Sequence, residues 1–419
     1  MLQILRNAWK VEELRKKILY TLFMLLIFRL VGVVPTPGVN AEYIASAVVN
    51  SDLLSMLSII NGSQFVNYTI LAMGIGPYIT ASIVIQLLTI AIPKLEQLSK
   101  EGEEGRKKIQ NYTRYATVIL AAVQAIGIIL GIGSQAVVSN DFFTYLTIGI
   151  SMAAGTAFSM WIGERITEKG IGNGISLLIF VGIVSSLPTQ FASVVSGYVN
   201  GYSALWTAPI LLIAIVGLIV GVVCVDVGVR KIPVQYAKRV VGRKMYGGQN
   251  TYLPIKVNST GVLPLIFASS ILQFPLIIAN FWPNSGFTQW LNKAFHSSSA
   301  AYLIVFALLI IAFTFFYSMI SFNPNEIAKN LQENGGFIPG IRPGRPTSEY
   351  IHRVSNRLNV FAAIFLALIA VVPTLFLALT GNVSPFTATG ILIAVSVSIE
   401  TSKQIESQML MRHYKGFLN

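Results

Sequence analysis

Side chains able to do covalent or metal chemistry are few in this 419-residue chain. The three histidines, His296, His352 and His413, all lie outside the long apolar runs, so a Ser-His pair or a zinc site within a membrane has no histidine to use. The single cysteine, Cys224, excludes a disulfide framework and a cysteine-rich metal site. A GxxxxGK[ST] phosphate-binding loop is also missing from the sequence. We therefore predict no enzyme, no cofactor and no metal.

Ionisable residues inside the apolar runs are equally scarce. Asp226, Glu164 and Glu400 fall at the ends of runs, where water is near, and only Arg29 lies deeper. An ion-coupled pump generally needs carboxylates within the membrane. The sequence thus favours a conduit driven from outside and lined by apolar groups. An ion-coupled small-solute secondary transporter stays as the alternative, because Ser, Asn and backbone carbonyls can also bind sodium.

The elements that must position such a conduit are long apolar runs. Hydrophobic residues make up 54% of the chain, charged residues only 11%, and the mean hydropathy is +0.67; soluble proteins are about 25% charged. Runs of about 20 residues can cross a hydrocarbon core as helices, and these lack the alternation of barrel strands. The predicted spans lie near residues 18–34, 69–92, 115–133, 142–163, 174–195, 207–227, 260–282, 301–321, 358–379 and 385–399.

Basic residues gather in the two terminal tails and in alternate loops. All but two of the 30 Lys and Arg residues lie there, the exceptions being Arg29 and Lys293. The positive-inside rule places these segments, and so both termini, in the cytosol. An even number of spans agrees with this placement. The net charge of +13 then reflects membrane topology.

Two features interrupt this simple pattern. Residues 52–60 form an apolar stretch too short to span, which predicts either a surface helix or a re-entrant element. Gly74-Ile75-Gly76-Pro77 stands at the start of the second predicted span. Beside the short stretch, it predicts a helix that is interrupted where it meets a cavity.

The loops at about residues 229–258 and 322–357 are unusually long. Both mix basic residues with Gly and Pro, and loops longer than about 12–15 residues are usually functional or disordered. Aromatic and aliphatic residues such as Tyr236, Tyr252 and Ile341 argue against disorder. Two interpretations stay open: a solvated basic face that only reflects topology, or a docking surface for a large acidic partner.

Five long motifs, in order along the chain, resemble the bacterial SecY family, the central channel subunits of the general protein translocase. They are AMGIGPYITASIVIQLL (72–88), GTAFSMWIGERITEKGIGNGISLLIF (155–180), KIPVQYAKR (231–239), QNTYLPIKVNSTGVLPLIFASS (249–270) and NPNEIAKNLQENGGFIPGIRPG (323–344).

The resemblance implies an all-α polytopic membrane protein with ten transmembrane helices. Two five-helix halves, residues 1–200 and 201–419, would form a clamshell around a central hourglass pore, with a plug near residues 50–67. The implied function is a protein-conducting channel that translocates unfolded secretory polypeptides across the plasma membrane and releases membrane segments laterally. An accessory SecY that serves few substrates is the alternative within the family.

The resemblance also implies three groups of site residues. A pore ring of aliphatic side chains falls on Ile75, Ile79, Ile175, Ile179, Ile266 and Ile393. A lateral gate between the second and seventh spans falls on Thr80, Gln86, Gln273 and Phe274, where polar groups could hold the seam closed. Docking positions fall on Arg239, Arg243, Arg342 and Arg345.

The residues themselves agree with the ring and docking assignments. Ile75 and Ile79, like Ile175 and Ile179, are four apart, so each pair shares one helix face. A dry aliphatic constriction blocks ions by dewetting, and arginine suits phosphate and carboxylate partners. The implied partners are the SecE and SecG subunits, the motor ATPase SecA, the ribosome through RNA phosphates, signal-bearing precursor polypeptides and membrane lipid.

Overall fold

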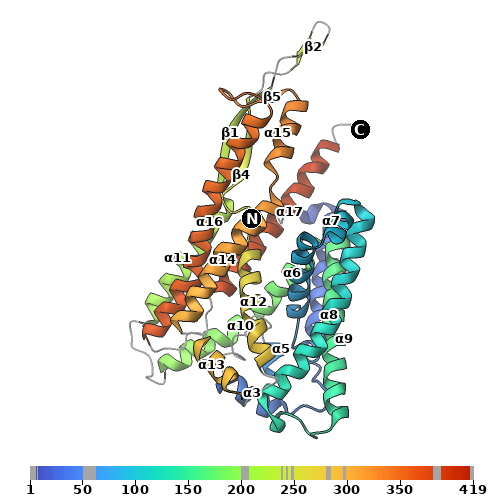
Figure 1. Ribbon diagram of the computed structural model, residues 1–419, viewed down its shortest axis with the longest axis vertical. Helices are drawn as coiled ribbons and strands as arrows, with labels where there is room; N and C mark the ends of the chain where they lie inside the picture. Colours follow the sequence, from blue (N-terminus) through green and yellow to red (C-terminus); the bar gives the residue numbers. More distant parts are fainter. Residues whose placement is uncertain are drawn as a thin grey trace.

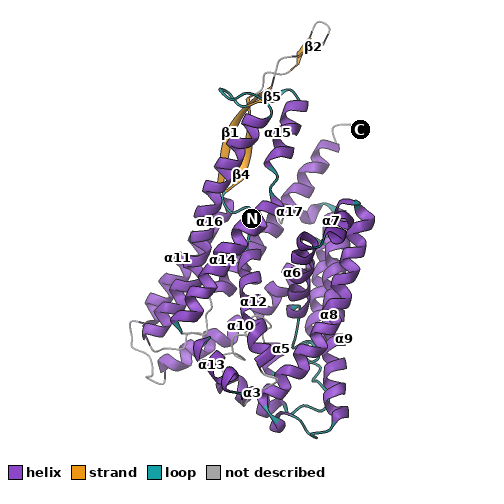
Figure 2. Ribbon diagram, viewed as in Figure 1, coloured by secondary structure: helices purple, strands orange, loops and turns teal. Residues whose placement is uncertain are grey.

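Helices dominate the computed structural model of the chain (Figure 2). It describes residues 6, 8–50, 63–199, 207–236, 239–241, 244–246, 250–279, 285–295, 299–380 and 388–415. Each predicted span falls on a helix. In chain order these helices are α2 (Glu12–Val31), α6 (Gly76–Ala91), α8 (Glu103–Ile132), α9 (Phe142–Lys169), α10 (Gly174–Val199), α11 (Thr207–Val227), α12 (Leu263–Ala279), α14 (Ala300–Ser321), α16 (Arg345–Thr380) and α17 (Ala388–Lys415).

Several of these helices are long and apolar enough to cross a membrane. Within the described residues four helices pass this test alone, namely α8, α9, α14 and α16. Helix α6 and the following α7 (Pro93–Lys100) meet at 101° and make a fifth if the bent pair counts as one span. Shorter apolar helices cover 174–188, 215–227 and 263–279. The prediction of a helical membrane protein is confirmed.

The membrane helices contact one another in two sets. In the first set, α8 packs on α6 and α9, and α9 also packs on α2 and α10. In the second set, α14 packs on α12 and α16, and α17 packs on α11 and α16. The main contacts between the sets are those of α12 with α6 and α8, and of α10 with α17.

The backbone before α6 is irregular, as the glycine and proline at 74–77 predict. Gly74 has a φ of 51°, a left-handed conformation that favours glycine, and α6 begins only at Gly76 with Pro77 in its first turn. Short elements α3 (Ala41–Asn50) and α5 (Ser63–Val66) lie on either side of the predicted stretch 52–60, which falls outside the described residues.

The two long basic loops fold together at one end of the molecule, where the strands gather in Figure 1. Strand β1 (Val229–Tyr236) pairs antiparallel with β4 (Asn250–Lys256), Val229 lying opposite Lys256. Its other edge pairs with β5 (Gly336–Phe337) of the second loop, so the strand order is β4-β1-β5. A separate hairpin joins β2 (Arg239–Val241) to β3 (Lys244–Tyr246).

Helix α15 (Pro324–Glu333) and the start of α16 cover this sheet. Alternate residues of β1, Ile232 and Val234, are buried in one cluster with Leu331, Ile338 and Ile351. The all-α fold expected from the sequence did not include these strands. They form because the loop carries a period-two apolar pattern that can be buried against the amphipathic α15.

Gly155 of α9 offers a test of this packing. A Cβ atom there would lie 2.1 Å from the carbonyl oxygen of Ile70, a backbone atom that cannot give way easily. We expect Gly155→Ala to lower the free energy of unfolding by about 1–3 kcal/mol, as overpacking does. Thermal unfolding of the purified protein measures this loss.

Gly217 of α11 is the matched control, because a Cβ there meets nothing within 4 Å. Gly217→Ala should be neutral or stabilising by up to about 1 kcal/mol. Equal stability of the two variants would show that α9 does not approach Ile70 this closely.

Candidate functional site

The six predicted ring isoleucines belong to one apolar cluster at the centre of the helices. Ile75 precedes α6 and Ile79 lies on it, while α10, α12 and α17 carry the other four. The buried members are Ile75, Ile79, Ile179 and Ile393, and the half-buried members are Ile175 and Ile266. The structure thus assembles these residues from four elements that are distant in sequence.

A small cavity lies beside this cluster. Its volume is about 20 Å³, and its walls include Ile75, Ile79, Ile179 and Phe28. A space of this size holds about one water molecule.

Gln64 of α5 is a polar residue that the sequence analysis missed. It lines the same cavity, and its side-chain nitrogen is buried without a hydrogen-bond partner. An unpaired buried amide is costly. No motif in the sequence singled out this residue.

The one arginine deep in a predicted span has a structural partner. Arg29, at the end of α2, donates a hydrogen bond from Nη2 to the carbonyl oxygen of Val181 on α10, at 2.9 Å. Charged side chains in membranes commonly pair in this way with backbone carbonyls. The contact joins two helices beside the isoleucine cluster.

The predicted gate residues lie on two helices that touch, α6 and α12. Thr80 is buried, and its hydroxyl donates to the carbonyl oxygen of Gly76 in its own helix, at 3.2 Å. Gln86 and Gln273 are half-buried and Phe274 is exposed. Among these four described side chains, none hydrogen-bonds across the seam.

Asp226, at the end of α11, is the centre of a polar cluster that the sequence analysis did not predict. One carboxylate oxygen accepts from Asn258 at 2.8 Å and the other accepts from Ser396 of α17. Lys403 donates to the Asp226 carbonyl oxygen at 3.2 Å. Because Ser396 lies one turn after Ile393, this cluster fixes the register of α17 at the ring.

The predicted docking arginines separate into two places. Arg342 is exposed in the turn between β5 and α16, where its carbonyl oxygen accepts from the Thr347 hydroxyl at 2.8 Å. Arg345 begins α16 with its side chain 91% exposed, and it pairs with Glu349 at 3.0 Å. Arg239 lies in β2, and Arg243 lies outside the described residues. The structure brings Arg342 and Arg345 onto one basic turn.

These features define a class of protein. Apolar helices meet around a cluster of aliphatic side chains, and a folded basic unit stands at one end of them. That combination fits a membrane channel.

Comparison with known proteins identifies the family. The SecY family model matches residues 69–402. Protein translocase subunit SecY of Streptomyces scabiei is 44% identical, and that of Halalkalibacterium halodurans is 42% identical, each over the full length of both chains. The chain belongs to the SecY family, and it is a channel subunit and a multi-pass membrane protein.

Solved structures show the same fold. A structure described as that of a protein conducting channel has a TM-score of 0.69 at 19% identity, covering 94% of this chain and 92% of its own. A channel protein in the canine ribosome-channel complex from the endoplasmic reticulum has a TM-score of 0.64 at 17% identity, with the same coverage. The family implies ten membrane helices, and membership excludes both an enzyme and the small-solute transporter.

The Asp226 cluster generates a stability prediction. Asp226→Ala removes the acceptor of Ser396 and one of the two acceptors of Asn258, which keeps its bond to the Gly261 carbonyl oxygen, so we expect a loss of about 1–3 kcal/mol in the free energy of unfolding. Asp141, exposed before α9 with no side-chain capping bond, provides the matched control. Thermal unfolding should separate Asp226→Ala from Asp141→Ala, and equal curves would contradict the structural role of the cluster.

Proposed function

We propose that this chain forms the pore through which unfolded secretory polypeptides cross the bacterial plasma membrane, and that it releases membrane segments sideways into the bilayer. The observation that carries this proposal is the shared cluster of six isoleucines, of which Ile75, Ile79 and Ile179 line a cavity of about 20 Å³. Their side chains form no hydrogen bonds, so they exclude water when closed and part at low cost around a passing chain.

The pore opens between two halves, residues 1–200 and 201–419, in this proposal. Support comes from the helix contacts, because the main contacts between the sets are those of α12 with α6 and α8 and of α10 with α17. The seam of α6 and α12 is the lateral gate, with Thr80, Gln86, Gln273 and Phe274 along it. A plug near residues 50–67 completes the proposed pore, and most of this segment lies outside the described residues.

Both termini and the basic sheet face the cytosol in this proposal. Leu14 at the start of α2 and Ile405 near the end of α17 are buried in one small cluster, and Lys17 donates to Gln408 at 3.4 Å. The two terminal segments therefore share one end of the bundle, as the distribution of basic residues requires.

The basic turn docks the partner that supplies the driving force. We assign Arg342 and Arg345, with Arg239 and Arg243 of the other loop, to contacts with the motor ATPase SecA or with ribosomal RNA phosphates. An arginine fork binds carboxylate or phosphate in two places at once. The SecE and SecG subunits complete the complex.

A first experiment tests the ring. Ile179→Thr keeps a branched side chain but adds a hydroxyl to the constriction, so water enters more easily. In vesicles that contain the chain with SecE, we expect a several-fold rise in ion conductance and the transport of precursors with weakened signal sequences. Protease protection of the precursor, with SecA and ATP added, measures the transport.

Ile119→Thr is the matched control, because Ile119 of α8 is 65% exposed and lies outside the ring cluster. It should leave conductance and signal selection at the wild-type level. A tight, fully selective channel with Ile179→Thr would overturn the ring assignment.

A second experiment tests the docking turn. Arg342→Glu reverses a charge at an exposed contact, and losing such a pair costs several kcal/mol. We expect ATP-dependent protection of the precursor to fall by more than about tenfold, with ion conductance unchanged. Arg353→Glu, an equally charged change at another exposed position of α16, should retain transport. Transport at the wild-type rate with Arg342→Glu would remove this turn from the docking surface.

A further inference from the structure

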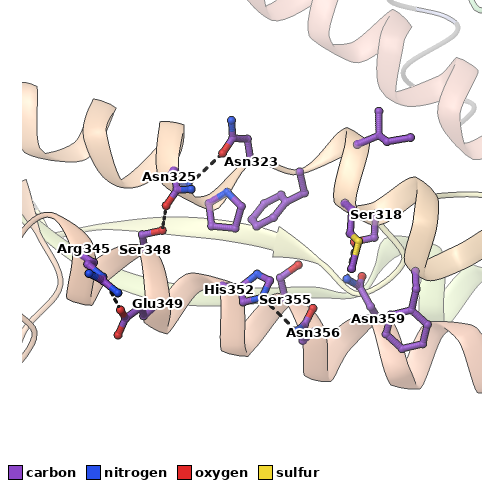
Figure 3. Close-up of a pocket in the computed structure, with 15 residues that line it drawn as sticks. Ser318, Asn323, Asn325, Arg345, Ser348, Glu349, His352, Ser355, Asn356 and Asn359 are labelled. Atoms are coloured by element: carbon purple, nitrogen blue, oxygen red, sulfur yellow. Dashed lines mark hydrogen bonds and ion pairs between the residues drawn. The ribbon is translucent and has the colours of Figure 1, made fainter. Parts of the chain in front are cut away.

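A pocket of about 630 Å³ lies between the end of α14, the start of α15 and the first four turns of α16 (Figure 3). This volume is that of a small-molecule site. It is separate from the isoleucine cluster, and the proposed docking turn touches it only at Arg345.

One stripe of α16 supplies most of the polar lining. Ser348, His352, Ser355, Asn356 and Asn359 recur at helical spacing, so they share one face. Figure 3 shows this face turned toward Asn323 and Asn325 at the start of α15. The opposite wall is therefore the N-terminal turn of a ten-residue helix, where the backbone dipole favours a negative group.

Several of these groups already have partners. The Ser348 hydroxyl donates to Asn325 Oδ1 at 2.5 Å, and the Asn359 amide donates to the Ser318 hydroxyl. Asn356 Nδ2 and His352 Nε2 form a hydrogen bond 3.3 Å long. Ser355 does not: the residue is only 5% exposed and lines the pocket, and no hydrogen bond joins its hydroxyl to another described residue. A hydroxyl that opens onto a polar pocket without a protein partner is available to donate to a ligand.

The pocket changes character along its length. Met319 and Ile320, on the last turn of α14, are 73% and 44% exposed and form its apolar end. Arg345 and Glu349 form the opposite end and pair with each other. The apolar run of α16 begins near residue 358, so the pocket crosses the boundary between hydrocarbon and water. An amphiphile with a polar head fits this gradient.

The ionisable lining selects the kind of head. Arg345 and Glu349 are the charged residues of the lining, and their charges balance; His352 is the third ionisable residue there. Glu349 lies about 9 Å along α16 from Ser355, a span that a phosphate and an adjacent amine, each with one hydrogen bond, can bridge. A balanced lining suits a zwitterion better than a headgroup with net negative charge.

We propose that this pocket binds the headgroup of a zwitterionic, amine-bearing phospholipid of the phosphatidylethanolamine class. The phosphate accepts from Ser355 and Asn356 beside the N-terminus of α15, and the amine donates to Glu349. The acyl chains lie along Met319 and Ile320. The proposal depends on the chain being a membrane protein and not on its function as a channel.

Native mass spectrometry of the full-length complex tests this site. The complex is stripped of lipid and titrated separately with phosphatidylethanolamine, phosphatidylcholine and phosphatidylglycerol. We expect the ethanolamine lipid to be retained most strongly. Ser355→Ala should weaken its retention about tenfold, the effect of losing one hydrogen bond to a charged group.

Controls separate this site from general lipid binding. Ser99→Ala of α7 removes a hydroxyl that bonds only within its own helix, and it should leave retention unchanged. Asn356→Ala is a second variant that should act in the same direction as Ser355→Ala.

Three outcomes would overturn the proposal. The first is equal retention of all three lipids, or retention that Ser355→Ala does not alter. The second is stronger retention of phosphatidylglycerol than of phosphatidylethanolamine, which would show that the pocket prefers an anionic lipid headgroup. The third is a photo-crosslink from position 356 to a protein subunit in intact membranes, which would make the pocket a protein contact.

Discussion

The structure depends on one constraint: a membrane channel at rest must stop water with side chains that bind neither water nor each other strongly. Isoleucine meets this constraint, and six of them from α6, α10, α12, α17 and the turn before α6 share one cluster. Dispersion contacts between such side chains are individually weak. In the proposed pore, the same cluster would therefore exclude water at rest and separate without breaking hydrogen bonds.

Placing Ile75 at this cluster requires irregular backbone inside a membrane protein. The chain from Tyr68 to Ile75 is not helical, yet its polar groups are paired: Thr36 N–H donates to the Tyr68 carbonyl oxygen and Ile70 N–H donates to the Val34 carbonyl oxygen. Non-helical backbone at membrane depth is tolerated only where protein satisfies it in this way. Gly155 lets α9 pack directly against this non-helical backbone at Ile70, because a larger residue would collide with the Ile70 carbonyl oxygen.

The sequence predicts local features better than distant contacts. The helices follow from apolar runs, and the late start of α6 follows from Gly74 and Pro77, because both signals are local. The pairing of β1 with β5 joins two strands with four helices between them along the chain, and Asp226 meets Ser396 across a still longer stretch of sequence. Single-sequence patterns carry no information about such partners. Gln64 was missed for a simpler reason, since nothing in its neighbours marks a cavity.

The sheet gives the basic turn a mechanical connection to the membrane helices. Because β5 pairs with β1, the two long loops are joined in one sheet, and the buried Ile351 of α16 packs against that sheet. Helix α16 continues without a break from Arg345 to Thr380 and contacts α14 and α17. Helix α17 in turn carries Ile393 and is held by Asp226 through Ser396. In the proposed docking, a partner bound at Arg342 would thus be connected to the isoleucine cluster through a continuous set of packed helices.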